Sequence, residues 1–276
     1  MREDYHKQAD VLGVDVALMR PEKATVITVE SLKRKGTYAV YFLCAADSLY
    51  CQNQPKYADG VNNCDMVFPG DYHTEMAAYH RKDSDSPGHM GAYARAYFEK
   101  LFNKLNHLGK EGHVVSRTEE DMQALIDFLS HHFDNLNLEG TVYHQENEGE
   151  AERVVNEING RIPDVVLFAL TPSAQLEILA NYKGMINASL CIYHEALPFY
   201  VKAETQVVPR FFQALHLDRF YLWLRREGKI RNRIIGTMFR KQVLDKQIVE
   251  ESQDESDLQE SESGSKDSED DSSTKE

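Results

Sequence analysis

Short apolar runs alternate with amphipathic segments along residues 1–207, and this alternation limits the folds open to the chain more than any other feature. The apolar runs are rich in β-branched and aromatic residues, which is typical of buried strands. They lie at 38–44, 65–70, 112–116, 140–144, 163–170 and 187–194. The amphipathic segments, predicted as helices, span 91–108, 118–133, 148–159 and 172–182. We therefore predict an α/β fold, a Rossmann-like and mostly parallel sheet with helices on both faces.

Ligands of such sheets bind beyond the carboxyl ends of the strands. We therefore expect functional side chains in the loops after the predicted strands. These loops follow Cys44, Phe68, Ser116, Leu170 and His194.

The formal net charge of −14 is unevenly distributed. Residues 1–207 carry 19 basic and 30 acidic side chains, residues 208–246 carry 10 and 3, and residues 247–276 carry 2 and 12. We interpret these parts as an α/β domain, a basic helical appendage and an acidic Ser-rich tail. The tail has too few apolar side chains to offset its ordering entropy, so we predict that it is disordered. It either solvates the chain or competes with phosphates for the basic appendage.

The appendage has apolar residues at helical spacing with arginines between them. Such a segment suits a phosphate-rich or membrane surface. The alternative is a helix pair that packs on the sheet and leaves a solvated basic face.

Several classes of protein are disfavoured. No apolar run approaches the roughly 18 residues that are needed to span a membrane. The opening MREDYHKQAD is polar and does not read as a signal peptide. The four cysteines form no CxxC pair, and no GxGxxG or P-loop motif occurs. We expect a cytoplasmic protein that is neither a nicotinamide dehydrogenase nor an NTPase.

Four segments resemble, in their order and spacing, the WecG/TagA/CpsF family of bacterial glycosyltransferases. They are VLGVDVALMRPEKATVITVESL, NNCDMVFPGD, INGRIPDVVLFALTPSAQ and VPRFFQALHLDRFYLWLRREGKIRNR. The first looks like the family's opening, a Gly-Val turn leading into its first helix. The resemblance covers roughly residues 10–246.

The resemblance implies a hexosyltransferase for cell-wall or surface polysaccharide. It would move an N-acetylated amino sugar, ManNAc-like, from a UDP donor to a polyprenyl-diphosphate-linked sugar, with inversion. It would work as a peripheral protein at the inner face of the cell membrane. The UDP-sugar is a substrate, and neither a cofactor nor a metal is expected.

The resemblance and the strand ends also suggest site residues. Asp71 is the candidate base and Gln175 the candidate partner of sugar hydroxyls. The candidate phosphate-binding cations are Arg117, Arg225, Arg226, Arg231 and Arg233. Asp71 could instead be a turn residue, Gln175 a surface residue of a helix, and the arginines a solvated face. His194 with Glu195 is an alternative acid–base pair, and Asp65 is interpreted as a turn or cap residue.

The chain departs from the family's motifs. Phe42-Leu43-Cys44-Ala45 stands where the family has Thr-Leu-Asn-Ala, Gly70-Asp71 replaces Asp-Gly, and Ser116-Arg117 replaces Gly-Gly. These departures support a rival hypothesis from another class, an eroded pseudoenzyme that serves as an accessory or binding subunit of the pathway.

Metal ions and nucleic acid are both disfavoured as partners. The 11 histidines show no metal-ligand spacing such as HExxH, although Asp71, His73 and Glu75 lie close together. The acidic body and tail would repel nucleic acid, so we expect no nucleic-acid partner. The sequence leaves a homo-oligomer open.

Overall fold

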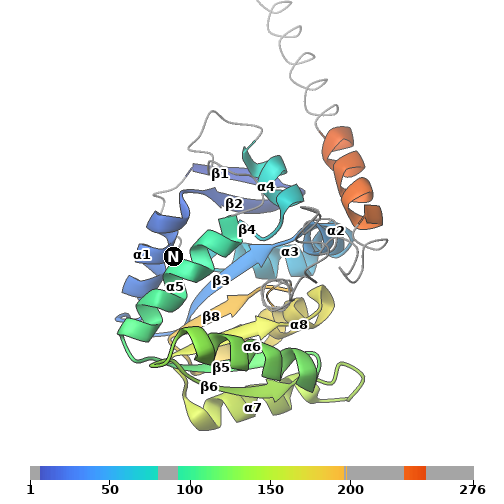
Figure 1. Cartoon of the computed structure of the whole chain (residues 1–276). Helices are drawn as coiled ribbons and strands as arrows, with labels where there is room; N and C mark the ends of the chain where they lie inside the picture. The colour runs from blue at the N-terminus through green and yellow to red at the C-terminus, as the bar shows by residue number, and fades with distance from the viewer. Residues whose placement is uncertain (1–6, 80–92, 196, 198–232, 247–276) are drawn as a thin grey trace, which may run out of the picture.

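The computed structural model describes residues 7–79, 93–195, 197 and 233–246, and it confirms the predicted α/β fold (Figure 1). One sheet contains six strands in the order β4-β3-β8-β7-β5-β6, and all neighbouring pairs are parallel. Their bounds are β3 (Tyr38–Leu43), β4 (Met66–Pro69), β5 (Glu111–Ser116), β6 (Asn137–Val142), β7 (Val165–Ala169) and β8 (Leu190–Tyr193). All six predicted strands are present, although β6 begins at Asn137 rather than at residue 140.

Helices cover both faces of this sheet (Figure 1). One face carries α1 (Pro21–Ser31), α5 (Tyr93–His107) and α6 (Glu119–His132). The other carries α2 (Ala45–Asn53), α3 (Pro55–Asn62), α7 (Glu150–Arg161) and α8 (Pro172–Tyr182), which a short 3₁₀ turn, η1 (Lys183–Met185), follows. The central strands are buried on both sides, which is why they are continuous apolar runs in the sequence.

Residues near the N-terminus form a hairpin that the sequence analysis did not predict. Strands β1 (Lys7–Val11) and β2 (Val14–Leu18) pair antiparallel. The turn between them places Leu12 at φ 54° and Gly13 at φ 89°, the left-handed pair that suits a two-residue hairpin. The first helix, α1, follows β2, so the chain runs from this turn through a short strand into the helix.

Residues 233–246 are helical, which agrees with a helical appendage. The remaining residues of the predicted appendage and the whole acidic tail lie outside the described residues. This C-terminal helix packs on the α/β body through Phe239, which is 1% exposed. Its Gly236 faces the imidazole of His73 on α4 (Tyr72–Tyr79), and Lys246 forms an ion pair with Asp10 of the hairpin.

Candidate active site

The carboxyl ends of the six strands meet at one edge of the sheet because all neighbouring pairs are parallel. The loops that leave β3 and β4 lie side by side there, since these two strands are paired from Val40 with Met66 to Leu43 with Pro69. Helix α2 begins directly after β3, and α4 begins directly after β4. This end of the sheet is where a ligand site is expected in an open α/β fold.

Asp71 lies between these two helix starts and contacts both. Its Oδ2 accepts a hydrogen bond of 2.9 Å from the backbone N–H of Ala45, the first residue of α2. Its Oδ1 accepts a bond of 2.9 Å from the backbone N–H of Thr74, in the first turn of α4. Asp71 therefore caps α4 as the turn interpretation required. The same half-buried carboxylate also stands at the mouth of the sheet, where the proposed base belongs.

Gly70 explains how Asp71 comes so close to the end of β3. The Gly70 N–H donates to the Leu43 carbonyl oxygen at 2.7 Å. A Cβ at this position would lie 2.8 Å from Cys44 Sγ and 2.8 Å from the Phe42 carbonyl oxygen. Only glycine fits this close approach without moving the β3 backbone, so the order Gly-Asp aims the carboxylate at Ala45.

Asp47 is a second acidic residue at this edge, and the sequence analysis missed it. It is fully buried, and its Oδ2 accepts the Cys44 N–H at 2.8 Å, which closes a capping box at the start of α2. Burial, followed by the charge of Glu195, raises the pKa of Asp47 well above its ordinary value. In the sequence Cys44-Ala-Ala-Asp47, the acidic residue stands three positions after the helix cap. This spacing is the sequence signal that could have revealed Asp47.

His194 lies where β8 ends, but its ring is inside the protein. It is fully buried and packs against Phe42 and Phe98, with ring centroids 5.2 and 5.6 Å away. Burial lowers the pKa of His194 to about 3, so the imidazole is neutral at physiological pH. Its Nδ1 lies 3.9 Å from Cys44 Sγ. A buried neutral ring does not exchange protons readily with a ligand, which weakens the alternative acid–base pair of His194 and Glu195.

Gln175 is buried at the end of β7 rather than exposed on the surface of α8. Its amide nitrogen donates to the carbonyl oxygens of Leu170 at 2.9 Å and Phe168 at 3.3 Å. Its Oε1 has no hydrogen-bond partner in the described part of the chain. The side chain therefore closes the end of β7 and keeps one acceptor, and its contact with a sugar hydroxyl stays a prediction.

The structure describes only two of the candidate cations. Arg117 follows β5 and forms an ion pair of 3.5 Å with Asp121. Arg233 is exposed in the C-terminal helix. Arg225, Arg226 and Arg231 lie outside the described residues.

Asp71, Gln175 and Arg117 share the carboxyl edge without meeting one another. They follow β4, β7 and β5, which occupy the first, fourth and fifth places in the sheet. Neighbouring strands lie about 4.8 Å apart, so β4 and β7 are separated by about 14 Å. A ligand that contacts all three side chains must be an extended molecule.

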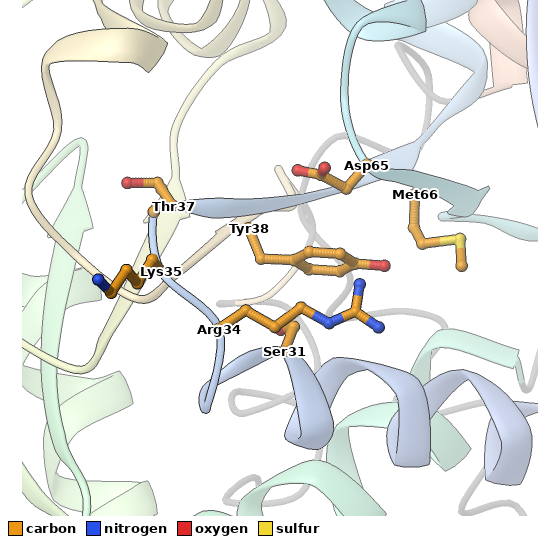
Figure 2. Close-up of a pocket in the computed structure, with 8 residues that line it drawn as sticks. Ser31, Arg34, Lys35, Thr37, Tyr38, Asp65 and Met66 are labelled. Carbon is orange, nitrogen blue, oxygen red and sulfur yellow. The ribbon is translucent and has the colours of Figure 1, made fainter. Parts of the chain in front are cut away.

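A hollow of about 140 Å³ lies at the opposite, amino edge of the sheet. In Figure 2 the Arg34 guanidinium lies on one side of the Tyr38 ring and the Asp65 carboxylate on the other. Asp65 accepts the Ala39 N–H at 2.8 Å and so ties the start of β4 to β3. The hollow is smaller than the roughly 300–1,000 Å³ of ordinary ligand sites, and it is far from Asp71 along β4.

Within the described ranges, no group of three or more His, Cys, Asp or Glu side chains is placed to hold a metal ion. Among the same residues, no helix has the length and apolar character needed to cross a bilayer.

The sequence model of the Glycosyl transferase WecG/TagA/CpsF family matches residues 9–248, most of the chain. The chain belongs to this family. No curated protein sequence matches it. Membership in WecG/TagA/CpsF implies a glycosyltransferase in cell-surface polysaccharide synthesis, and it agrees with the parallel sheet described above.

The departures from the WecG/TagA/CpsF motifs lie at the same edge. Phe42, in place of threonine, is fully buried and packs edge-on against Tyr97 at 5.0 Å. Cys44, in place of asparagine, is 5% exposed, and burial raises its pKa well above the ordinary value. Both side chains lie in the hydrophobic core, so backbone groups rather than these side chains are available to a ligand at the end of β3.

Proposed function

We propose that this chain transfers an N-acetylated amino sugar, ManNAc-like, from a UDP donor to a polyprenyl-diphosphate-linked sugar, with inversion at the anomeric carbon. The observation that carries the proposal is the Asp71 carboxylate, which two helix starts hold at the carboxyl ends of β3 and β4. Membership in the WecG/TagA/CpsF family supports the reaction class.

Asp71 is the general base of this reaction. Its Oδ2 accepts one backbone hydrogen bond and keeps a lone pair that can take the proton of the acceptor hydroxyl. The acceptor oxygen then forms its bond to the anomeric carbon from the face opposite the UDP. The bond from that carbon to the UDP oxygen breaks, and the diphosphate leaves with the electron pair.

The leaving diphosphate needs cations, because the edge around Asp71 is acidic. Asp47 and Glu195 lie near Asp71, close enough for the charge of each to act on Cys44. Arg117 and the appendage residues Arg225, Arg226, Arg231 and Arg233 are the proposed sources of positive charge. A guanidinium suits this role because it stays charged and donates to two phosphate oxygens at once.

The C-terminal helix supports a peripheral position on the inner face of the cell membrane. Ile234, Met238 and Leu244 are 54%, 52% and 57% exposed on it. The exposed cations Arg233, Arg240 and Lys241 lie among them. Apolar and basic side chains on one surface favour the interface of an anionic bilayer, where each cation contributes about 1 kcal/mol.

The decisive experiment replaces Asp71 by asparagine and measures UDP release with a lipid-diphosphate-sugar acceptor. We expect turnover to fall on the order of 10²-fold in a folded protein. Asp65→Asn is the matched control, because Asp65 directly precedes β4 and also accepts a backbone N–H, that of Ala39 in β3, but at the amino edge. An unchanged rate in Asp71→Asn rules out this base.

The second candidate is an accessory subunit that keeps the fold but not the chemistry. The burial of Phe42 and Cys44, where the family has a hydroxyl and an amide, favours it. Calorimetric titration with UDP separates the two candidates. Binding supports the enzyme, and the lack of any heat signal supports the accessory subunit.

A further inference from the structure

The hydroxyl of Thr74 contacts the Asp71 carboxylate, and the reaction outlined above assigns it no task. Thr74 is fully buried in the first turn of α4. We propose that Thr74 is a positioning residue, which locks the Asp71 carboxylate against the start of α2. Its benefit to catalysis rests on the proposed function, whereas the link between α4 and α2 rests on hydrogen bonds alone.

Two donors from Thr74 converge on one oxygen. Its backbone N–H lies 2.9 Å and its Oγ1 lies 3.0 Å from Asp71 Oδ1. In return, the Asp71 N–H donates to Thr74 Oγ1 at 3.3 Å. The result is a reciprocal pair of the capping-box type, which fixes the Asp71 side chain relative to its own backbone.

The Thr74 hydroxyl has one proton and a choice of two acceptors. Oγ1 also lies 3.1 Å from the Asp71 carbonyl oxygen. That carbonyl already accepts the Glu75 N–H at 3.0 Å, as the helix requires. The proton therefore goes to the carboxylate, where a charge-assisted hydrogen bond is the stronger one.

With Oδ1 held by two donors, the carboxylate cannot rotate freely. Oδ2 is then directed at the Ala45 N–H, at 2.9 Å. The first turn of α2 is thus tied to the first turn of α4 through a single side chain. Without the Thr74 hydroxyl, Asp71 gains rotational freedom, and its bond to Ala45 opens more often.

The test measures amide hydrogen exchange at Ala45 in the full-length protein. Thr74→Val removes the hydroxyl at nearly constant volume, and Thr74→Ser retains it. Thr25→Val is the matched control, because Thr25 is also a buried helical threonine, bonded at 2.8 Å to the Pro21 carbonyl oxygen. Thr74→Ala replaces Thr74→Val if valine does not fold.

We expect exchange at Ala45 to rise about tenfold in Thr74→Val and to stay near the wild-type rate in Thr74→Ser and Thr25→Val. An unchanged rate at Ala45 in Thr74→Val overturns the link between α4 and α2. This readout needs no transferase activity, so it does not fail if the proposed function fails.

Steady-state kinetics tests the benefit to transfer. We expect kcat to fall about tenfold in Thr74→Val with KM for the UDP-sugar unchanged, and serine to restore it. Equal kcat values in Thr74→Val and Thr25→Val overturn the positioning role in catalysis. An active Asp71→Asn protein, by contrast, removes the proposed base and leaves the exchange result standing.

Discussion

Gly70 and Cys44 are packed so closely that a methyl group on Gly70 would lie 2.8 Å from Cys44 Sγ. The same methyl group would lie 2.8 Å from the carbonyl oxygen of Phe42, a backbone atom of β3 that side-chain rotation cannot move. This contact sets the distance between the ends of β3 and β4, and through it the position of Asp71.

Gly70→Ala should therefore damage both stability and function. We expect the free energy of unfolding to fall by about 1–3 kcal/mol, as for other overpacked positions. Transfer should fall as well, because the β4 end must move away with Asp71. Gly160→Ala is the control, since a Cβ there meets no atom within 4 Å. Denaturant unfolding and UDP release measure the two effects, and equal stability of both variants would contradict the close contact.

Asp47→Asn should change how stability depends on pH. The pKa of Asp47 is raised well above its ordinary 3.8, so the folded state binds this proton more tightly than the unfolded state does. The resulting stability is present below the ordinary pKa and is lost as pH rises toward the folded value. Relative to Asp47→Asn, the wild-type protein should lose unfolding free energy as pH rises above the ordinary pKa of 3.8. Urea unfolding at a series of pH values measures this difference. Parallel curves of unfolding free energy against pH for the two proteins would contradict the prediction.

His194→Phe should protect the fold in acid. The pKa of His194 is about 3 in the folded protein against an ordinary 6.5. Its contribution to stability is therefore complete above the ordinary pKa and is lost as pH falls from 6.5 toward 3, by about 1.4 kcal/mol per pH unit. Phenylalanine keeps the stacking with Phe42 and Phe98 and does not titrate. We expect circular dichroism to show a shallower acid transition in His194→Phe than in the wild-type protein. Identical slopes for the two proteins would contradict the lowered pKa of His194.

Gly236→Ala should loosen the contact between the C-terminal helix and α4. The added methyl group would overlap the His73 imidazole, so the ring or the helix must shift, and a shift of the helix would expose Phe239. Protease cleavage near Phe239 should become faster. Thr237→Ala changes an exposed neighbour in the same helix and should leave the cleavage rate unchanged. Equal cleavage of the two variants would mean that the helix tolerates the methyl group.

Neutralising the exposed basic side chains of the same helix should weaken membrane binding. Combined replacement of Arg233, Arg240 and Lys241 by glutamine should remove about 1 kcal/mol per cation from the affinity for anionic vesicles. Co-sedimentation should also become less sensitive to salt. Vesicle binding that equals the wild-type level would assign the membrane contact to another part of the chain.

The strands of the sheet were predictable because burial on both faces turns them into apolar runs. β7, for example, is VVLFA with every residue buried. The N-terminal hairpin was not predictable, because its strands have only five residues each and contain the polar residues Gln8, Asp10 and Asp15. α2, α3 and α4 were also missed, since each has only eight or nine residues and is held by tertiary packing.

The position of the site in the fold was predictable from the sequence, but the arrangement of its side chains was not. Asp71 and Arg117 follow apolar runs, so the sequence puts them at the carboxyl edge. The bond from Ala45 to Asp71 joins residues 26 positions apart and depends on the close approach at Gly70. The burial of Gln175 depends on its amide group meeting the carbonyl oxygens of Phe168 in β7 and of Leu170 just after it.

The position of β8 has a consequence for how the chain is made. Among the described residues, β8 is the last strand of the sheet in sequence, yet it lies in the interior, between β3 and β7. Until it leaves the ribosome, β3–β4 and β7–β5–β6 are separate half-sheets, each with an unpaired inner edge. Unpaired strand edges of this kind can pair with strands of other nascent chains. Completion of the sheet during synthesis therefore waits for Leu190–Tyr193, and a chaperone that shields open strand edges would act before that point.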